Sequence, residues 1–302
     1  MSCLHYRRFQ GAAGCQTLLQ PLLCSGHFGL GPLAKILFYL CPKGSALASL
    51  SIIIISHNEA NNIQDCLRSV AFADEVVVLD SGSADDTVPL ARAMGARVST
   101  SADWQGFGIQ KNRALDAASC DWVLSLDADE RVTPELAQEI QSQLLRVDSD
   151  AHPPAFEVPR LTQFCGVWIR HCGWTPDYVL RLFKRGEARF SDDLVHEKLQ
   201  LLTADTRVVR LKNPLLHYSY PTPEHYWRKL QRYSQDWARQ RHACGQRTSI
   251  TRAALSAITA FVRSYVFQRG FLDGAMGFAV CTMQAQAAFG KYFELYCLGR
   301  QK

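Results

Sequence analysis

The sequence Trp-Val-Leu-Ser-Leu-Asp-Ala-Asp-Glu, residues 122–130, decides the fold prediction. Its apolar first half indicates a short buried strand, which leads directly into Asp127 and Asp129. Side chains at positions i and i+2 of an extended chain point to the same side. Two hard oxygen ligands at the carboxyl end of a parallel strand suit a divalent ion that carries a diphosphate. An Asp-x-Asp sequence alone is equally typical of a turn with a helix cap.

Two upstream segments repeat this arrangement of an apolar run followed by polar residues. Residues 51–59 read Ser-Ile-Ile-Ile-Ile-Ser-His-Asn-Glu, and residues 75–82 read Glu-Val-Val-Val-Leu-Asp-Ser-Gly. Such continuous apolar runs are typical of strands buried on both faces of a parallel sheet. Helical periodicity predicts one helix over residues 63–70 and a second over residues 87–94. The alternating order predicts an α/β fold with a doubly wound nucleotide-binding half.

Four motifs in this region resemble those of family-2 glycosyltransferases. They are Ile-Ile-Ser-His-Asn-Glu at 54–59, Val-Val-Leu-Asp-Ser-Gly-Ser-Ala-Asp-Asp-Thr at 77–87, Lys-Asn-Arg-Ala-Leu at 111–115 and Leu-Asp-Ala-Asp-Glu at 126–130. The resemblance covers roughly residues 50–235 and is greatest to the lipopolysaccharide core β-1,4-glucosyltransferases. It implies a GT-A fold, a UDP-sugar donor, Mg²⁺ or Mn²⁺ as cofactor, and inversion at the anomeric carbon.

The resemblance also assigns residues to the donor site. An Asp at the position of Asp80 binds the nucleoside in the family, although an Asp followed by Ser-Gly-Ser also stabilises turns. A cation at Arg113 would offset the diphosphate charge. The predicted donor-site residues are His57, Asn58, Glu59, Asp80, Arg113 and Asp127.

The metal site and the catalytic base are predicted from the same resemblance. The expected metal ligands are Asp127, Asp129 and His217, since GT-A enzymes often supply a downstream His. An inverting transfer needs one carboxylate to take the proton of the acceptor hydroxyl. Glu197, in a His-Glu pair that the subgroup shares, is the predicted base, and Asp192 and Asp193 are its rivals.

The charge of the chain is uneven. Residues 225–302 hold 12 Lys or Arg against 3 Asp or Glu, although the whole chain carries a formal charge of only +5. A basic tail of this kind predicts an anionic partner. We expect an anionic membrane surface and no nucleic acid, because no nucleic-acid motif accompanies the charge. The predicted location is therefore cytoplasmic, peripheral on the inner face of the cytoplasmic membrane.

Three regions are expected along the chain. Residues 1–48 form a poorly ordered extension that only faintly imitates a signal peptide. Residues 49–235 form the glycosyltransferase domain, with a nucleotide-binding half at 49–147 and an acceptor half at 148–235. Residues 236–302 form a basic, amphipathic helical tail. No apolar stretch reaches 18 residues, so no transmembrane helix is predicted. The 11 Cys lack metal-ligand spacing, which favours reduced thiols.

The sequence therefore predicts a metal-dependent, inverting hexosyltransferase. The expected donor is UDP-glucose, and the expected acceptor is an inner-core heptose of lipopolysaccharide or another lipid-linked sugar. A polyprenyl-phosphate sugar synthase is the nearest alternative, because it shares every motif of the first half. A non-catalytic nucleotide-sugar-binding protein is the alternative of another class.

Overall fold

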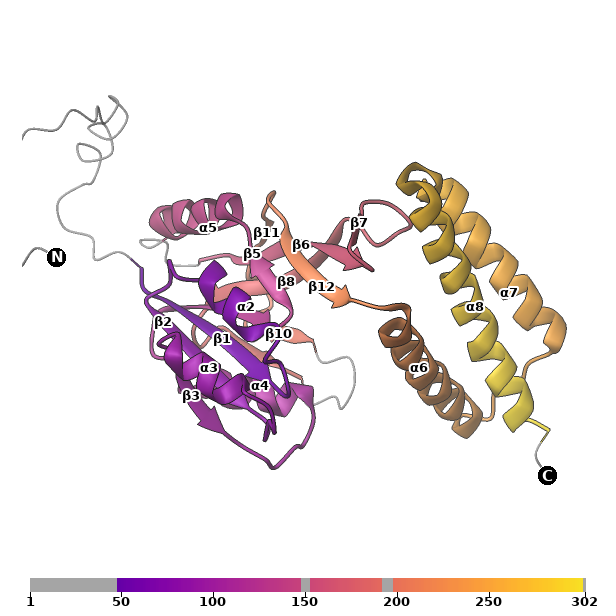
Figure 1. Cartoon of the computed structure of the whole chain (residues 1–302), viewed down its shortest axis with the longest axis horizontal. Helices are drawn as coiled ribbons and strands as arrows, with labels where there is room; N and C mark the ends of the chain where they lie inside the picture. Colours follow the sequence, from indigo (N-terminus) through magenta and orange to yellow (C-terminus); the bar gives the residue numbers. More distant parts are fainter. Residues whose placement is uncertain (1–47, 148–152, 192–197, 301–302) are drawn as a thin grey trace, which may run out of the picture. The chain divides into compact units, whose positions relative to one another are not determined.

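The computed structural model describes residues 48–147, 153–191 and 198–300 (Figure 1). The predicted N-terminal extension lies outside the described residues, apart from Ala48. Across the described residues, ten strands form one sheet in the order β3-β2-β1-β4-β8-β6-β12-β5, with β7 and β11 added to β6. A separate hairpin pairs β9 (Ala188–Phe190) with β10 (Leu199–Leu201).

The first half of the sheet is parallel, as the sequence predicts. It contains β1 (Leu50–Ser56), β2 (Glu75–Asp80), β3 (Arg97–Thr100) and β4 (Trp122–Asp127). The register places Ser56 beside Asp80 and Ile55 beside Asp127. The carboxyl ends of β1, β2 and β4 therefore meet at one edge of the sheet, where ligands of open α/β sheets bind.

The second half of the sheet is mixed. The antiparallel β8 (Asp177–Lys184) joins β4 to the long β6 (Ala155–Phe164), which also pairs with β7 (Val167–Ile169). Two strands occur over residues 208–220, β11 (Val208–Arg210) and β12 (Leu215–Tyr220). Pro214, which cannot donate a ladder hydrogen bond, directly precedes β12. The edge strand β5 (Glu130–Val132) runs antiparallel to β12.

Both faces of the parallel half are covered by helices. Alternate side chains of β1 point to opposite faces, so Ile52 and Ile54 join one core and Ile53 the other. The first core also contains side chains of α2 (Ile63–Ser69), α3 (Thr87–Ala93) and α5 (Pro134–Val147). The second contains side chains of α4 (Phe107–Ala117) and β9. This coverage explains the unbroken apolar runs in the strands.

The C-terminal region is helical. It comprises α6 (Pro223–Ala243), α7 (Ile250–Val262), a π-helical turn η1 (Arg263–Phe267), a 3₁₀ turn η2 (Gly270–Asp273) and α8 (Gly274–Leu298). Thr222 caps α6, and Pro223 occupies its first position. The boundary predicted at residues 235–236 thus falls inside α6. A third core joins α6 and α8 to the end of β6 through residues such as Phe164, Tyr226 and Val280.

Two further observations concern the described residues as a whole. None of their helices combines the length and apolarity needed to cross a membrane. The seven cysteines among them are all free thiols, including Cys165 and Cys172.

Candidate active site

Asp127, the last residue of β4, is held by two cations. Its carboxylate lies 3.0 Å from Nζ of Lys111, on α4, and accepts a 2.8 Å hydrogen bond from Arg181, on β8. Burial alone would raise the pKa of Asp127, but the charges of Arg181 and Lys111 outweigh it and keep the pKa well below its usual range. Asp127 is therefore a fixed negative charge at the edge of the sheet.

Glu130 completes this buried charge network. Its side chain is fully buried, accepts the backbone N–H of Asp127 at 2.9 Å and accepts a second 2.8 Å hydrogen bond from Arg181. Burial raises the pKa of Glu130. The guanidinium of Arg181 therefore lies between two carboxylates from the same strand–turn segment and fixes how β4 leads into β5.

Asp129 faces His217 rather than Asp127. Its carboxylate lies 3.3 Å from Nε2 of His217, because antiparallel pairing of β5 with β12 brings His217 beside the end of β4. Burial would raise the pKa of Asp129, but His217 lowers it. Nδ1 of His217 is buried without a hydrogen-bond partner among the described residues.

Of the three predicted metal ligands, Asp129 and His217 thus contact each other, whereas Asp127 contacts Lys111 and Arg181. No cluster of three or more His, Cys, Asp or Glu side chains suited to a metal ion occurs in the part of the chain that the structure describes. Both carboxylate oxygens of Asp127 contact cations, whereas Asp129 and His217 present an oxygen and a nitrogen to each other. Asp129 and His217 are therefore the pair best placed to receive an ion.

Asp80 contacts its own turn. Its buried carboxylate accepts hydrogen bonds from the backbone N–H groups of Gly82 and Ser83, at 2.9 and 2.8 Å, and from the hydroxyl of Ser56 at 3.0 Å. Gly82 has a φ of +87°, a conformation that favours glycine. Asp80 therefore stabilises its own turn, which is the alternative that the sequence left open. A direct nucleoside contact by Asp80 stays a prediction.

The two cations of α4 occupy different places from those expected. Arg113 bonds Ser101 and Asp103, which follow β3, and Gln110 on α4 itself, and it does not line the cleft. Lys111, two residues earlier, instead lies against Asp127. Residues two apart on a helix point to different sides, so only Lys111 reaches the end of β4, whereas Arg113 reaches the residues after β3. Lys111 is therefore the better candidate for a diphosphate contact.

These groups line a cleft of about 1410 Å³. His57 and Glu59 line it from the end of β1, and Lys111, Asp127 and Asp129 lie at its floor. Asn58 is instead engaged in a loop contact, accepting the N–H of Ala84. Burial raises the pKa of Glu59, although a hydrogen bond from Asn62 opposes this.

The far wall of the cleft holds residues that the sequence did not single out. Arg160 on β6 and Lys229, Arg232 and Tyr233 on α6 all line it. Nζ of Lys229 lies 5.3 Å from the ring centroid of Tyr220. Only the fold brings α6 to the strand ends, so no local sequence signal could identify these cations.

The predicted base, Glu197, and its rivals Asp192 and Asp193 lie outside the described residues. Phe190 and Lys198, which bracket this segment in the sequence, both line the cleft.

Comparison with protein families relates part of the chain to glycosyltransferases. Residues 51–152 match the model of the family described as glycosyl transferase family 2. This part of the chain is therefore similar to glycosyl transferase family 2 domains, and the predicted GT-A-type α/β fold with added C-terminal helices is confirmed.

Similar whole proteins carry related names. An uncharacterized glycosyltransferase of Rickettsia prowazekii is 29% identical over 82% of this chain and 87% of its own length. The lipopolysaccharide core biosynthesis glycosyltransferase LpsC of Rhizobium meliloti is 28% identical over 82% of this chain and 92% of its own length.

Among solved structures, glucosyl-3-phosphoglycerate synthase of Mycobacterium tuberculosis, in complex with Mn²⁺, UDP and glucosyl-3-phosphoglycerate, is 26% identical with a TM-score of 0.31. That match covers 38% of this chain and 44% of the solved chain, less than half of either.

Proposed function

We propose that this protein is an inverting, metal-dependent glycosyltransferase that moves a hexose, glucose in the first instance, from a UDP-sugar to an inner-core heptose of lipopolysaccharide. The observation that carries the proposal is the pair Asp127 and Asp129 at the end of a parallel strand, facing a large cleft, in the part of the chain that is similar to glycosyl transferase family 2 domains. The similarity to LpsC supports the choice of acceptor.

Asp129 and His217 would hold the metal ion. The carboxylate oxygen of Asp129 is a ligand that Mn²⁺ and Mg²⁺ prefer, and Nδ1 of His217 is buried without a hydrogen-bond partner among the described residues. When bound, the ion would neutralise charge on the UDP leaving group as a Lewis acid.

Lys111 and Arg181 would assist the donor in different ways. Lys111 lines the cleft and contacts Asp127. Because a Lys side chain has a flexible four-carbon stem, its ammonium can turn from Asp127 toward a diphosphate oxygen. Arg181 is 4% exposed, so it holds Asp127 in place rather than contacting the sugar. In this scheme Lys111 replaces Arg113 as the cation expected near the diphosphate.

Glu197 is the proposed base. Its carboxylate would take the proton of the acceptor hydroxyl as that oxygen bonds to the anomeric carbon. The bond from that carbon to the diphosphate oxygen breaks in the same step, and UDP leaves with the electron pair. Attack from the face opposite the leaving group inverts the configuration. Support comes from Phe190 and Lys198, on either side of this segment in sequence, since both line the cleft.

The far wall of the cleft suits an anionic sugar acceptor. Lys229 supplies positive charge, as do Arg160 and Arg232 in part, since these two pair with Asp177 and Asp236. Trp174 and Tyr220 supply aromatic surface. Aromatic side chains pack against the apolar faces of sugars, and guanidinium and ammonium groups bind phosphate. A phosphorylated core sugar carries both features.

A transfer assay tests the proposal. UDP-sugars would be screened for transfer to a deacylated, heptose-ended core oligosaccharide, with Mn²⁺ or with a chelator. We expect metal-dependent transfer that Asp129→Asn abolishes and that Arg92→Gln, an exposed change on α3, leaves intact. Transfer to a polyprenyl phosphate in place of the core would favour the alternative synthase. Absence of both UDP release and UDP binding would refute the assignment as an enzyme.

A further inference from the structure

Eight large apolar side chains lie exposed on the C-terminal helices. They come from α7, η1, η2 and the start of α8, and each is between 40% and 77% exposed. We call this set the apolar face: Leu255, Ile258, Val262, Val266, Phe267, Phe271, Leu272 and Phe278. Soluble monomers rarely leave large apolar patches exposed without a partner.

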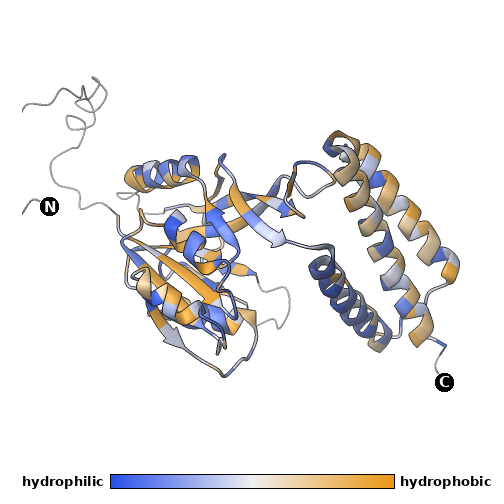
Figure 2. Ribbon diagram, in the orientation of Figure 1, coloured by the Kyte–Doolittle hydropathy of each residue, from blue (hydrophilic) through white to orange (hydrophobic). Residues whose placement is uncertain are grey.

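The apolar face follows the geometry of the helices. Leu255, Ile258 and Val262 recur at helical spacing along one side of α7, and Val266 continues the row into η1. Figure 2 shows the contrast with α6, which is coloured hydrophilic along most of its length, whereas α7 and α8 are largely hydrophobic. The exposed row is thus a property of this part of the chain and not of all three helices.

An aromatic cluster shapes the turn that ends the apolar face. The ring of Tyr265 lies 5.2 Å from that of Phe261, 6.2 Å from that of Phe271 and 5.8 Å from that of Phe278, measured between centroids. Gly270 is buried here, and a Cβ on it would lie 2.5 Å from Sγ of Cys281. The turn is therefore packed from within, while Phe267 and Leu272 remain exposed on its outer side.

The charges around the apolar face are positive. Arg252, Arg263 and Arg269 are exposed next to it, and residues 249–300 contain only two carboxylates, Asp273 and Glu294. The Asp273 side chain is 6% exposed and accepts the backbone N–H groups of residues 170 and 171. It is therefore not available to balance the arginines.

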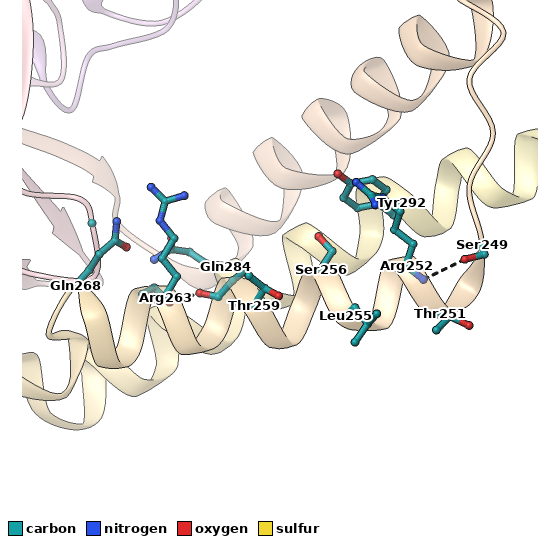
Figure 3. Close-up of a pocket in the computed structure, with 13 residues that line it drawn as sticks. Ser249, Thr251, Arg252, Leu255, Ser256, Thr259, Arg263, Gln268, Gln284 and Tyr292 are labelled. Carbon is teal, nitrogen blue, oxygen red and sulfur yellow. Dashed lines mark hydrogen bonds between the residues drawn. The ribbon is translucent and has the colours of Figure 1, made fainter.

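Two of these arginines also line a groove beside the apolar face. Arg252 on α7 and Arg263 on η1 line a cavity of about 850 Å³, together with Gln268 and Gln284 (Figure 3). Its lining contains Ser, Thr and Gln side chains and, among the described residues, no carboxylate. Such a lining suits the phosphate of an anionic headgroup.

We propose that the apolar face inserts into the headgroup region of a bilayer that contains anionic phospholipid, with Arg252, Arg263 and Arg269 at the level of the phosphates. Aromatic and aliphatic side chains beside arginines are the pattern of a peripheral membrane surface. A second copy of the chain is a poorer occupant, because two faces bearing the same positive charges repel each other. The inference rests on these helices alone and is independent of the reaction proposed above.

Vesicle sedimentation tests this proposal. The full-length protein would be mixed with vesicles of phosphatidylcholine alone or of phosphatidylcholine with phosphatidylglycerol. We expect binding to the anionic vesicles, release by high salt as the charges are screened, and weak binding to the neutral ones. The Phe267→Ala, Leu272→Ala double variant should bind at least about ten-fold more weakly, because two inserted apolar groups are lost.

Matched control variants show whether vesicle binding depends on the apolar face or on exposed side chains in general. Leu272 and Leu145, on α5, are both 56% exposed, so Leu145→Ala removes an equal apolar group elsewhere and should leave binding unchanged. Arg263→Gln should weaken binding about five-fold at low salt, whereas Arg92→Gln should not. Melting temperatures of all variants should stay near that of the wild type, because the replaced side chains are exposed.

Three results would overturn the proposal. Equal vesicle binding by the double variant and the wild type would exclude insertion of this face. A dimer in sedimentation velocity that the double variant abolishes, without vesicle binding, would make a second copy the occupant. Vesicle binding that appears only after deletion of residues 1–48 would mean that this segment of the chain occupies the face.

Discussion

Replacing Arg181 by Met should destabilise the protein strongly. The guanidinium donates 2.8 Å hydrogen bonds to both Asp127 and Glu130, and Arg181 and Glu130 are 4% and 0% exposed. Removing one partner of a buried ion pair costs about 3–5 kcal/mol, because it leaves an uncompensated buried charge. Since domains are stable by only about 5–15 kcal/mol, this variant should lose about a fifth or more of its free energy of unfolding.

Urea denaturation followed by circular dichroism measures this loss. The control is Arg68→Gln, whose partner Asp65 is also exposed on α2, and such surface pairs are worth about 1 kcal/mol or less. Adding Glu130→Gln to Arg181→Met should restore part of the stability, because the buried unpaired charge is removed while the acceptor for the Asp127 N–H remains. Equal unfolding midpoints for Arg181→Met and Arg68→Gln, or no recovery in the double variant, would refute this account of the charge network.

Three further predictions concern other parts of the chain. Glu197→Gln should slow transfer about 10²–10⁴-fold and preserve UDP affinity, and normal turnover of this variant together with an inactive Asp193→Asn would move the base to Asp193. The pKa of Glu75 is about 2, because hydrogen bonds from Ser51, Ser119 and Arg97 outweigh its burial. Its ionised form therefore stabilises the fold above pH 4.5, and this stabilisation is lost as the pH falls toward 2. Glu75→Gln should flatten the unfolding free energy over that range, and an unchanged pH profile would contradict it. Deleting residues 1–48 should leave transfer and melting temperature nearly unchanged, and an insoluble or inactive product would show that the segment is part of the domain.

The parallel half of the sheet was predictable because its signals are local. Three apolar runs ending in polar residues fixed β1, β2 and β4, and their common direction followed from the helical segments between them. The same reasoning placed Asp127 and Asp129 at the end of a strand. The family resemblance, and not these local signals, grouped His217 with Asp129, and the antiparallel pairing of β5 and β12 brings the two side chains within 3.3 Å.

The charge network was not predictable, because its contacts join distant segments. Arg181 reaches Asp127 only through the antiparallel pairing of β4 with β8. Lys111 and Arg113 are equally cationic in the sequence, and only the orientation of α4 decides which one faces the strand ends. In the same way, Lys229 lines the cleft because the third core docks α6 against the end of β6.

The most direct test of the central claim is calorimetric titration of UDP into the protein with Mn²⁺ and with a chelator. Asp129→Asn is the informative variant, because Asp127 also pairs with buried Arg181 and its loss would mix binding with stability. We predict that Mn²⁺ strengthens UDP binding to the wild type at least about ten-fold, worth 1.4 kcal/mol, and that Asp129→Asn removes this gain. UDP binding that neither Mn²⁺ nor Asp129→Asn alters would contradict the metal site, and absence of UDP binding under any of these conditions would contradict the proposed function itself.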